Sequence, residues 1–119
     1  MREERLRATA GLRGSLDLSS WRGHSGRRYV VGVHPLAEAD IQDVVDAVLI
    51  AVRRDGDGVA RVVDVATVGS DPKPGVRARW TAAMRARGAT EMHIHRLADS
   101  DGERRAIIDD LRDEEAKAS

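Results

Sequence analysis

"EADIQDVVDAVLIAVRRDGDGVARVVDVATVG", residues 38–69, decides which fold this chain can adopt. The apolar residues from 41 to 52 recur at intervals of three and four, the spacing of an amphipathic helix. The runs AVLIAV and VARVVDVATV, however, are β-rich and flank RRDGDG, a turn sequence that contains Asp-Gly twice. We therefore predict a short helix or turn over about 37–45, then a hairpin of strands at 47–54 and 59–68. A single helix over 37–53 is the alternative.

The residues that precede this stretch predict a second hairpin. Residues 1–14 are charged and have little apolar periodicity, so we expect a flexible N-terminal arm. SLDLSSW then alternates apolar and polar side chains, and RRYVVGVH is a second β-branched run. RGHSG, between them, has the composition of a turn. Together they predict a hairpin over 16–34 that Pro35 ends.

The C-terminal half alternates helix and strand signals. GSDPKPG, residues 69–75, is a loop because of its prolines and glycines, and VRARWTAAMRAR predicts a helix that stops at Gly88. TEMHIHRL predicts a strand. ADSDGERRAIIDDLRDEEAK predicts the last helix, in which Ser100 and Glu103 form a capping box. Its apolar stripe consists of Ile107, Ile108 and Leu111.

This order of elements predicts an α+β fold, close to α/β. We expect a small mixed β-sheet built from hairpins, with two or three flanking helices. Residues 15–116 form one domain behind the arm of residues 1–14. A chain of 119 residues can build such a core without disulfides or a structural metal.

The composition excludes several kinds of chemistry. The chain has no cysteine, which rules out thiol catalysis and Cys-ligated zinc. Its 20 basic and 20 acidic residues balance, so there is no general attraction to nucleic acid, and three aromatic rings are too few for single-strand stacking. No apolar stretch could span a membrane, and residues 1–15 lack the apolar centre of a secretion signal. We expect a cytoplasmic protein with no membrane partner.

The segment GATEMHIHRL, residues 88–97, contains the candidate ligand-binding side chains. Side chains at alternate positions of a strand share a face, so Glu91, His93 and His95 lie together and Met92 and Ile94 face the core. Imidazoles and carboxylates are common metal ligands. Three such positions spread over about 13 Å, however, which is too far for one ion. We therefore predict a polar or ligand-facing sheet surface, with no metal and no cofactor.

Other acidic and glycine-rich motifs predict structure. DGDG, residues 55–58, lacks the further ligands of a calcium loop, so we interpret it as a hairpin turn. Asp109 and Asp110 lie among other charges and predict a solvated helix face. No serine stands in a GxSxG elbow, and no glycine-rich loop joins a strand to a helix.

Residues 46–112 resemble the GIY-YIG nuclease superfamily in the order of their predicted secondary-structure elements. DAVLIAVRRDGDGVARVVDVATVGSD is similar to the family's hairpin, which carries two tyrosine motifs. VRARWTAAMRARGATEMHIHRLADSDGERRAIIDDL is similar to the helix, strand and helix that follow, in which the first helix bears an arginine and the second a metal-binding glutamate. The most specific pieces are W..A...GAT..H.H and ERRAI..DL. The resemblance implies a GIY-YIG-like fold.

The resemblance also implies that catalysis has been lost. The two tyrosines would fall near Leu49 and Asp64, with the glycine after the second near Ala66. The glutamate would fall at Ile108. Magnesium requires oxygen ligands, which isoleucine lacks. Phosphodiester cleavage would therefore lose the metal ion that stabilises the leaving oxyanion. The family's helix arginine corresponds to Arg77 or Arg79.

We therefore expect a bacterial, non-catalytic GIY-YIG-like module for binding or scaffolding. Its binding surface should include Arg77, Arg79, His93 and His95, and its partner should be anionic, either nucleic acid or an acidic protein. Two alternatives stay open. One is a weak metal-dependent nuclease that acts on DNA and uses Asp109. The other is a homodimer formed through a strand edge, with a purely structural role.

Overall fold

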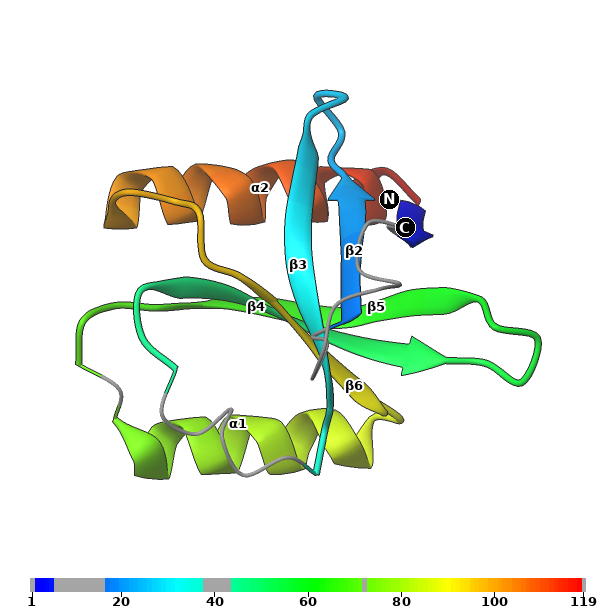
Figure 1. Ribbon diagram of the computed structural model, residues 1–119, viewed down its shortest axis with the longest axis horizontal. Coiled ribbons are helices and arrows are strands. Elements are labelled where there is room, and N and C mark those ends of the chain that lie inside the picture. The colour runs from blue at the N-terminus through cyan, green and yellow to red at the C-terminus, as the bar shows by residue number, and fades with distance from the viewer. Residues whose placement is uncertain (1, 6–16, 38–43, 72, 119) are drawn as a thin grey trace.

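The computed structural model describes residues 2–5, 17–37, 44–71 and 73–118. In these ranges the chain forms six strands and two helices. Their bounds are β1 Arg2–Arg5, β2 Asp17–Arg22, β3 Arg28–Pro35, β4 Ala47–Arg54, β5 Ala60–Val68, α1 Pro74–Ala86, β6 Glu91–His95 and α2 Asp101–Ala118. The strands make one curled sheet in the order β1-β2-β3-β6-β4-β5, with α1 and α2 on opposite faces (Figure 1).

Both predicted hairpins are confirmed, since β2 pairs with β3 and β4 pairs with β5. Every residue from 47 to 52 is buried, so side chains on both faces of β4 pack inside the protein. That burial explains why the apolar run forms a strand, and the alternative helix over 37–53 is wrong from Ala47 onward. Residues 38–43 of the predicted short helix or turn lie outside the described residues. Gly58 closes the β4–β5 turn with a φ of +86°, which favours glycine.

The sheet is antiparallel throughout, which corrects the expected mixed sheet. The connection from β5 through α1 brings β6 back parallel to β5. β6 does not pair with β5, however, but lies between β3 and β4 and runs antiparallel to both. The position of β6 therefore joins the two hairpins into one sheet and makes it a central strand.

The N-terminal residues 2–5 form strand β1, although we expected them to belong to a flexible arm. They pair with β2, and Glu3 stands opposite Trp21. Residues 6–14 of the predicted arm lie outside the described residues. The physical reason for this strand is a buried ion pair of Glu3, described below.

Local contacts define the end of α1 and the start of α2. Gly88 has a φ of +99° after α1, and the amide of Ala89 donates to Met84 O at 3.0 Å, which confirms the predicted stop. At the start of α2, Ser100 Oγ accepts from the Glu103 amide at 3.1 Å, which confirms the cap. The Glu103 carboxylate accepts from the Asp99 amide at 2.6 Å, one residue earlier than in a standard capping box.

Two apolar layers hold the helices against the sheet. The layer under α1 includes Leu36, Val44, Ala47, Leu49, Ala51, Val68, Met84, Ala89, Met92 and Ile94. The layer under α2 includes Trp21, Tyr29, Val31, Val48, Ile50, Val52, Val65, Ala98, Ile107 and Leu111. Within the described residues, neither helix has the combination of length and apolar character that crossing a membrane requires.

Candidate functional site

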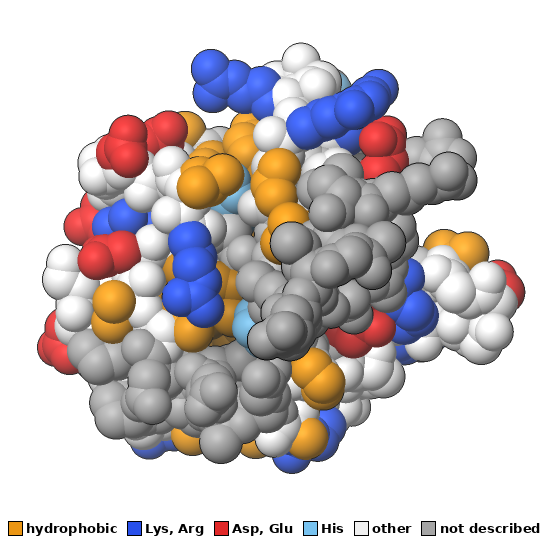
Figure 2. All heavy atoms as spheres, viewed as in Figure 1, with side chains coloured by type: hydrophobic (Ala, Val, Ile, Leu, Met, Phe, Trp, Pro, Cys, Tyr) orange, Lys and Arg blue, Asp and Glu red, His pale blue; other side chains and the backbone are white. Residues whose placement is uncertain are grey.

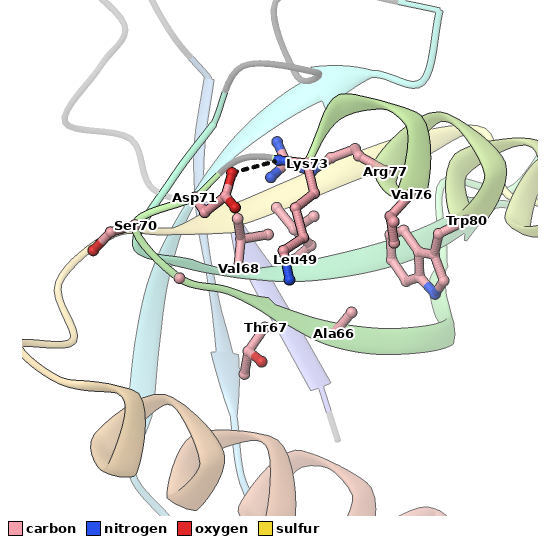
Figure 3. A pocket seen from close by; sticks show the side chains of 11 residues that line it. Leu49, Ala66, Thr67, Val68, Ser70, Asp71, Lys73, Val76, Arg77 and Trp80 are labelled. Carbon is pink, nitrogen blue, oxygen red and sulfur yellow. Dashed lines mark hydrogen bonds between the residues drawn. The ribbon is translucent and has the colours of Figure 1, made fainter.

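A pocket of about 390 Å³ opens between the first turns of α1 and the C-terminal end of β5 (Figure 3). Strands β4 and β5 and helix α1 supply its apolar lining, which consists of Leu49, Ala66, Val68, Val76 and Trp80. β5, the loop before α1 and the helix itself supply the polar residues of the lining, namely Thr67, Ser70, Asp71, Lys73 and Arg77. The pocket thus combines an apolar lining with a polar rim, the usual composition of a small-molecule site.

The polar rim at the start of α1 contains two cations, Lys73 and Arg77, and one carboxylate, that of Asp71. Lys73 occupies the N-cap position, and no side chain caps the helix there. The first turn contains no acidic residue, so the positive end of the helix dipole is not neutralised within it. The Lys73 side chain is exposed, and its backbone amide is 3.4 Å from Asp71 Oδ1 (Figure 3). An anionic group that entered the pocket would meet the helix end and Lys73, which together oppose the repulsion from the Asp71 carboxylate.

Of the two arginines predicted to bind a partner, only Arg77 lines this pocket. Arg77 is only 4% exposed, so its guanidinium forms part of the pocket wall. Arg79 is exposed on α1 and does not line the pocket. The predicted binding residues therefore include one residue of the pocket lining, Arg77, but not Lys73 or Trp80. The uncapped helix start after a Pro-Lys-Pro-Gly loop was the available signal for Lys73.

The two predicted histidines lie on the other side of the sheet. His93 stands opposite Ile50, and His95 stands opposite Val48, both on the face that α2 covers. Met92 and Ile94 face the α1 layer, as predicted. His93 is 0% and His95 5% exposed, so the expected polar surface is absent at these residues. The prediction that the histidines and the apolar residues of β6 lie on opposite faces is confirmed, but both faces of this central strand are buried.

His93 belongs to a hydrogen-bonded network that is almost completely enclosed. Trp21 Nε1 donates to His93 Nδ1 at 2.9 Å, and His93 Nε2 lies 2.9 Å from Glu91 Oε1. An indole N–H can only donate, so Nδ1 must be the acceptor and Nε2 carries the proton. Burial lowers the pKa of His93, partly offset by the hydrogen bond to Glu91. His93 is therefore a neutral, oriented imidazole.

Arg54 is the cation of this network. Its guanidinium binds both oxygens of Glu3 at 3.0 and 2.9 Å and both oxygens of Glu91 at 2.8 and 3.0 Å. A fifth bond reaches Gly58 O at 2.9 Å, so every N–H has an acceptor. Burial would raise the pKa of Glu91, but the bonds from Arg54 and His93 outweigh it and lower that pKa to about 2. The network joins β1 to β4 and β6 and explains why residues 2–5 form a strand.

His95 is held by a separate set of contacts. Its Nδ1 lies 2.7 Å from Val30 O, so this nitrogen carries a proton, and its ring stacks edge-on against Tyr29 at 5.6 Å. The Tyr29 hydroxyl donates to Asp110 at 2.6 Å, and the Asp110 carboxylate also accepts from the amide and hydroxyl of Ser25, both at 2.7 Å. Asp110 therefore anchors the β2–β3 turn to α2, which corrects its assignment to a solvated face. Asp109 is exposed, as expected.

The residues that the GIY-YIG resemblance assigns to catalysis divide between the two faces. Leu49, Ala66 and Arg77 line the pocket beside α1. Ile108 packs against the layer under α2, and Asp109 lies exposed on that helix. The sheet separates them. Among the residues with described positions, no three His, Asp or Glu side chains converge on a point that could hold a metal ion.

The outer edge of β5 is covered by side chains. Val65 O accepts from Arg112 of α2 at 2.8 Å, and Val63 O accepts from Arg87 at 3.2 Å. The Asp64 carboxylate accepts from the Val65 amide at 2.8 Å. Such side chains block the pairing of another strand. This arrangement disfavours a homodimer through the middle of β5.

Charged side chains of both signs are interspersed on the face shown in Figure 2, with basic ones over the tip of the β2–β3 hairpin.

No protein-family model, curated protein or solved structure gives a significant match to this chain.

Proposed function

We propose that the chain is a non-catalytic binding module that takes a small amphipathic anion into the pocket beside α1. The observation that carries this proposal is the position of the pocket: its apolar lining ends at an uncapped, lysine-bearing helix start. The ligand class follows from that arrangement. An apolar chain or ring would lie against Leu49, Val68 and Trp80, and a carboxylate or similar group would point toward Lys73.

The expected affinity is modest. Each CH₂ group that leaves water contributes about 0.8 kcal/mol, and an anion at a helix start gains about 0.3–1 kcal/mol. The loss of translational and rotational freedom opposes these gains. For a chain of eight carbons, gains of about 7 kcal/mol against a loss of at least about 4 kcal/mol leave about 3 kcal/mol. We therefore expect a Kd of a few millimolar, with a larger natural ligand binding more tightly.

The resemblance supports binding rather than cleavage. Leu49 and Ala66 offer the pocket no group that could activate water, and the isoleucine at the family's metal position lies across the sheet. A nuclease would need a metal ligand and a water-activating group on the same side as its arginine. The described lining contains one carboxylate, that of Asp71, and a single carboxylate does not supply both groups.

Calorimetric titration with three probes tests the proposal. Octanoate has both the apolar chain and the negative charge, acetate lacks the chain, and octylammonium reverses the charge. We expect octanoate to bind most tightly, and Lys73→Glu to remove that preference. Arg79→Glu makes the same charge change on an exposed position of α1 outside the pocket, so it serves as the control. Equal binding of octanoate and octylammonium, or equal losses in both variants, would refute an anion site in the pocket.

A further inference from the structure

Three arginines surround a second hollow, of about 410 Å³, near the other end of α1. Arg53 and Arg61 stand directly opposite each other on β4 and β5. Arg87 follows the last turn of α1 and enters the same hollow. Their side chains are 53%, 65% and 55% exposed, so all three guanidinium groups remain accessible from solvent.

These arginines share too few carboxylates for one-to-one pairing. Arg53 Nε and Arg61 Nε donate to the two oxygens of Asp55 at 3.0 and 2.8 Å. Arg87 lies 3.6 Å from Asp64, but Arg112 is closer to that carboxylate, at 2.9 Å. Four guanidinium groups thus contact two carboxylates. Like charges directly opposite each other on neighbouring strands repel each other. Asp55 offsets part of the repulsion between Arg53 and Arg61, and a bound anion would offset more of it.

The arginines are also held in position. Asp55 fixes the Nε of both Arg53 and Arg61, and among the described residues the terminal nitrogens of these two arginines have no hydrogen-bond acceptor. The stem of Arg53 passes close to Gly88, since a Cβ added there would lie 3.3 Å from Arg53 Cδ. Forked guanidinium donors match the oxygens of a tetrahedral anion.

We propose that Arg53, Arg61 and Arg87 form a binding site for a phosphate group. This site lies at the opposite end of α1 from the pocket described above and does not depend on the function proposed for it. The phosphate group can come from a small free phosphate or from the phosphodiester backbone of a nucleic acid. The three arginines would bind either one through its charged oxygens.

Titrations at low ionic strength with pyrophosphate and with a short oligothymidylate test this proposal, followed by NMR of the arginine Nε–H groups. We expect pyrophosphate to bind with a Kd of about 1 mM or tighter and to shift the resonances of Arg53, Arg61 and Arg87. Arg61→Gln and Arg87→Gln should each weaken binding about fivefold, the modest effect of an exposed ion pair. Arg105→Gln, at an exposed position of α2, is the matched control and should leave binding unchanged.

The two probes distinguish the source of the phosphate. If the oligonucleotide binds and competes with pyrophosphate, the site recognises a phosphodiester backbone; if only pyrophosphate binds, it recognises a small anion. Circular dichroism checks that each variant is folded. Failure of both probes to bind wild-type protein would overturn the proposal. An equal loss in Arg105→Gln would do so too, because it would indicate only general charge attraction.

Discussion

Replacement of Arg54 by methionine should destabilise the protein strongly. Methionine retains the apolar stem but removes the cation that binds Glu3 and Glu91, whose side chains are 7% and 18% exposed. Their carboxylates would then be buried without their main partner. The pKa of Glu91 falls from 4.5 to about 2, and each unit corresponds to about 1.4 kcal/mol, so Glu91 accounts for about 3 kcal/mol. With Glu3 included, we expect a loss of about 3–5 kcal/mol at neutral pH.

The pH dependence of this loss identifies its cause. A carboxylate whose pKa is lowered in the folded state contributes stability above its unfolded pKa, and that stability declines as pH falls toward the folded pKa. For Glu91 the contribution therefore declines between pH 4.5 and about 2. At pH 3 it should be about 1.4 kcal/mol, less than half of its value at pH 7. The difference between wild type and Arg54→Met should shrink accordingly.

Urea denaturation followed by tryptophan fluorescence measures both quantities, with the wild-type and variant proteins compared at each pH. Arg53→Met is the matched control, since Arg53 is the preceding residue, its side chain is 53% exposed, and it forms an ion pair with Asp55. We expect it to cost less than about 1 kcal/mol. If Arg54→Met costs no more than Arg53→Met, or if its cost does not change between pH 7 and pH 3, the reasoning about the buried network is wrong.

Three further predictions concern other parts of the chain. Burial lowers the pKa of His93 below its ordinary 6.5, so nitrogen-detected NMR at pH 7 should find the ring neutral and protonated at Nε2. Stability should decline as pH falls below 6.5, and a titration at or above 6.5 would contradict this. Gly23→Ala would place a Cβ 2.1 Å from the Asp110 carboxylate, which anchors the β2–β3 turn, and should lower the free energy of unfolding by about 1–3 kcal/mol. A Cβ at Gly56 would meet nothing within 4 Å, so Gly56→Ala is the control and should leave thermal stability nearly unchanged. Combined substitution of Asp64 and Arg112 by alanine should uncover the β5 edge, and light scattering should then detect concentration-dependent dimers. A variant that stays monomeric would show that these two side chains do not protect the edge.

The hairpins and helices could be predicted because their signals are local. The Asp-Gly turn separates two β-rich runs, Gly88 ends α1, and Ser100 begins α2. Each signal involves residues a few positions apart, and the structure confirms all of them. In the part of the ambiguous stretch that the structure describes as β4, burial on both faces favours a strand, and this burial depends on helices packed from both sides.

Strand β1 and the antiparallel sheet could not be predicted because they depend on distant contacts. The sequence REER has no alternation of apolar side chains, and β1 is fixed by Glu3, which binds Arg54 across 51 positions. The insertion of β6 between the hairpins likewise leaves no local signal. The same insertion buries His93 and His95, whose alternation with Met92 and Ile94 had suggested one polar face.

The candidate site was predicted only in part. Arg77 lines the pocket as a residue of the expected helix, but Lys73 and Trp80, which also line it, were not among the predicted binding residues. Asp110 was assigned to the solvated face of α2, because its partners Ser25 and Tyr29 lie more than 80 positions away. Single-element patterns identify the helix that carries a site, whereas the pocket itself depends on how that helix packs on the sheet.

Mapping of amide chemical shifts during an octanoate titration tests the binding proposal most directly. The account predicts that the largest shifts cluster in residues 66–71 and 73–80, on both sides of the pocket, and that Lys73→Glu abolishes them. No shifts at millimolar octanoate, or shifts centred on the α2 face around His95, would contradict a ligand site beside α1.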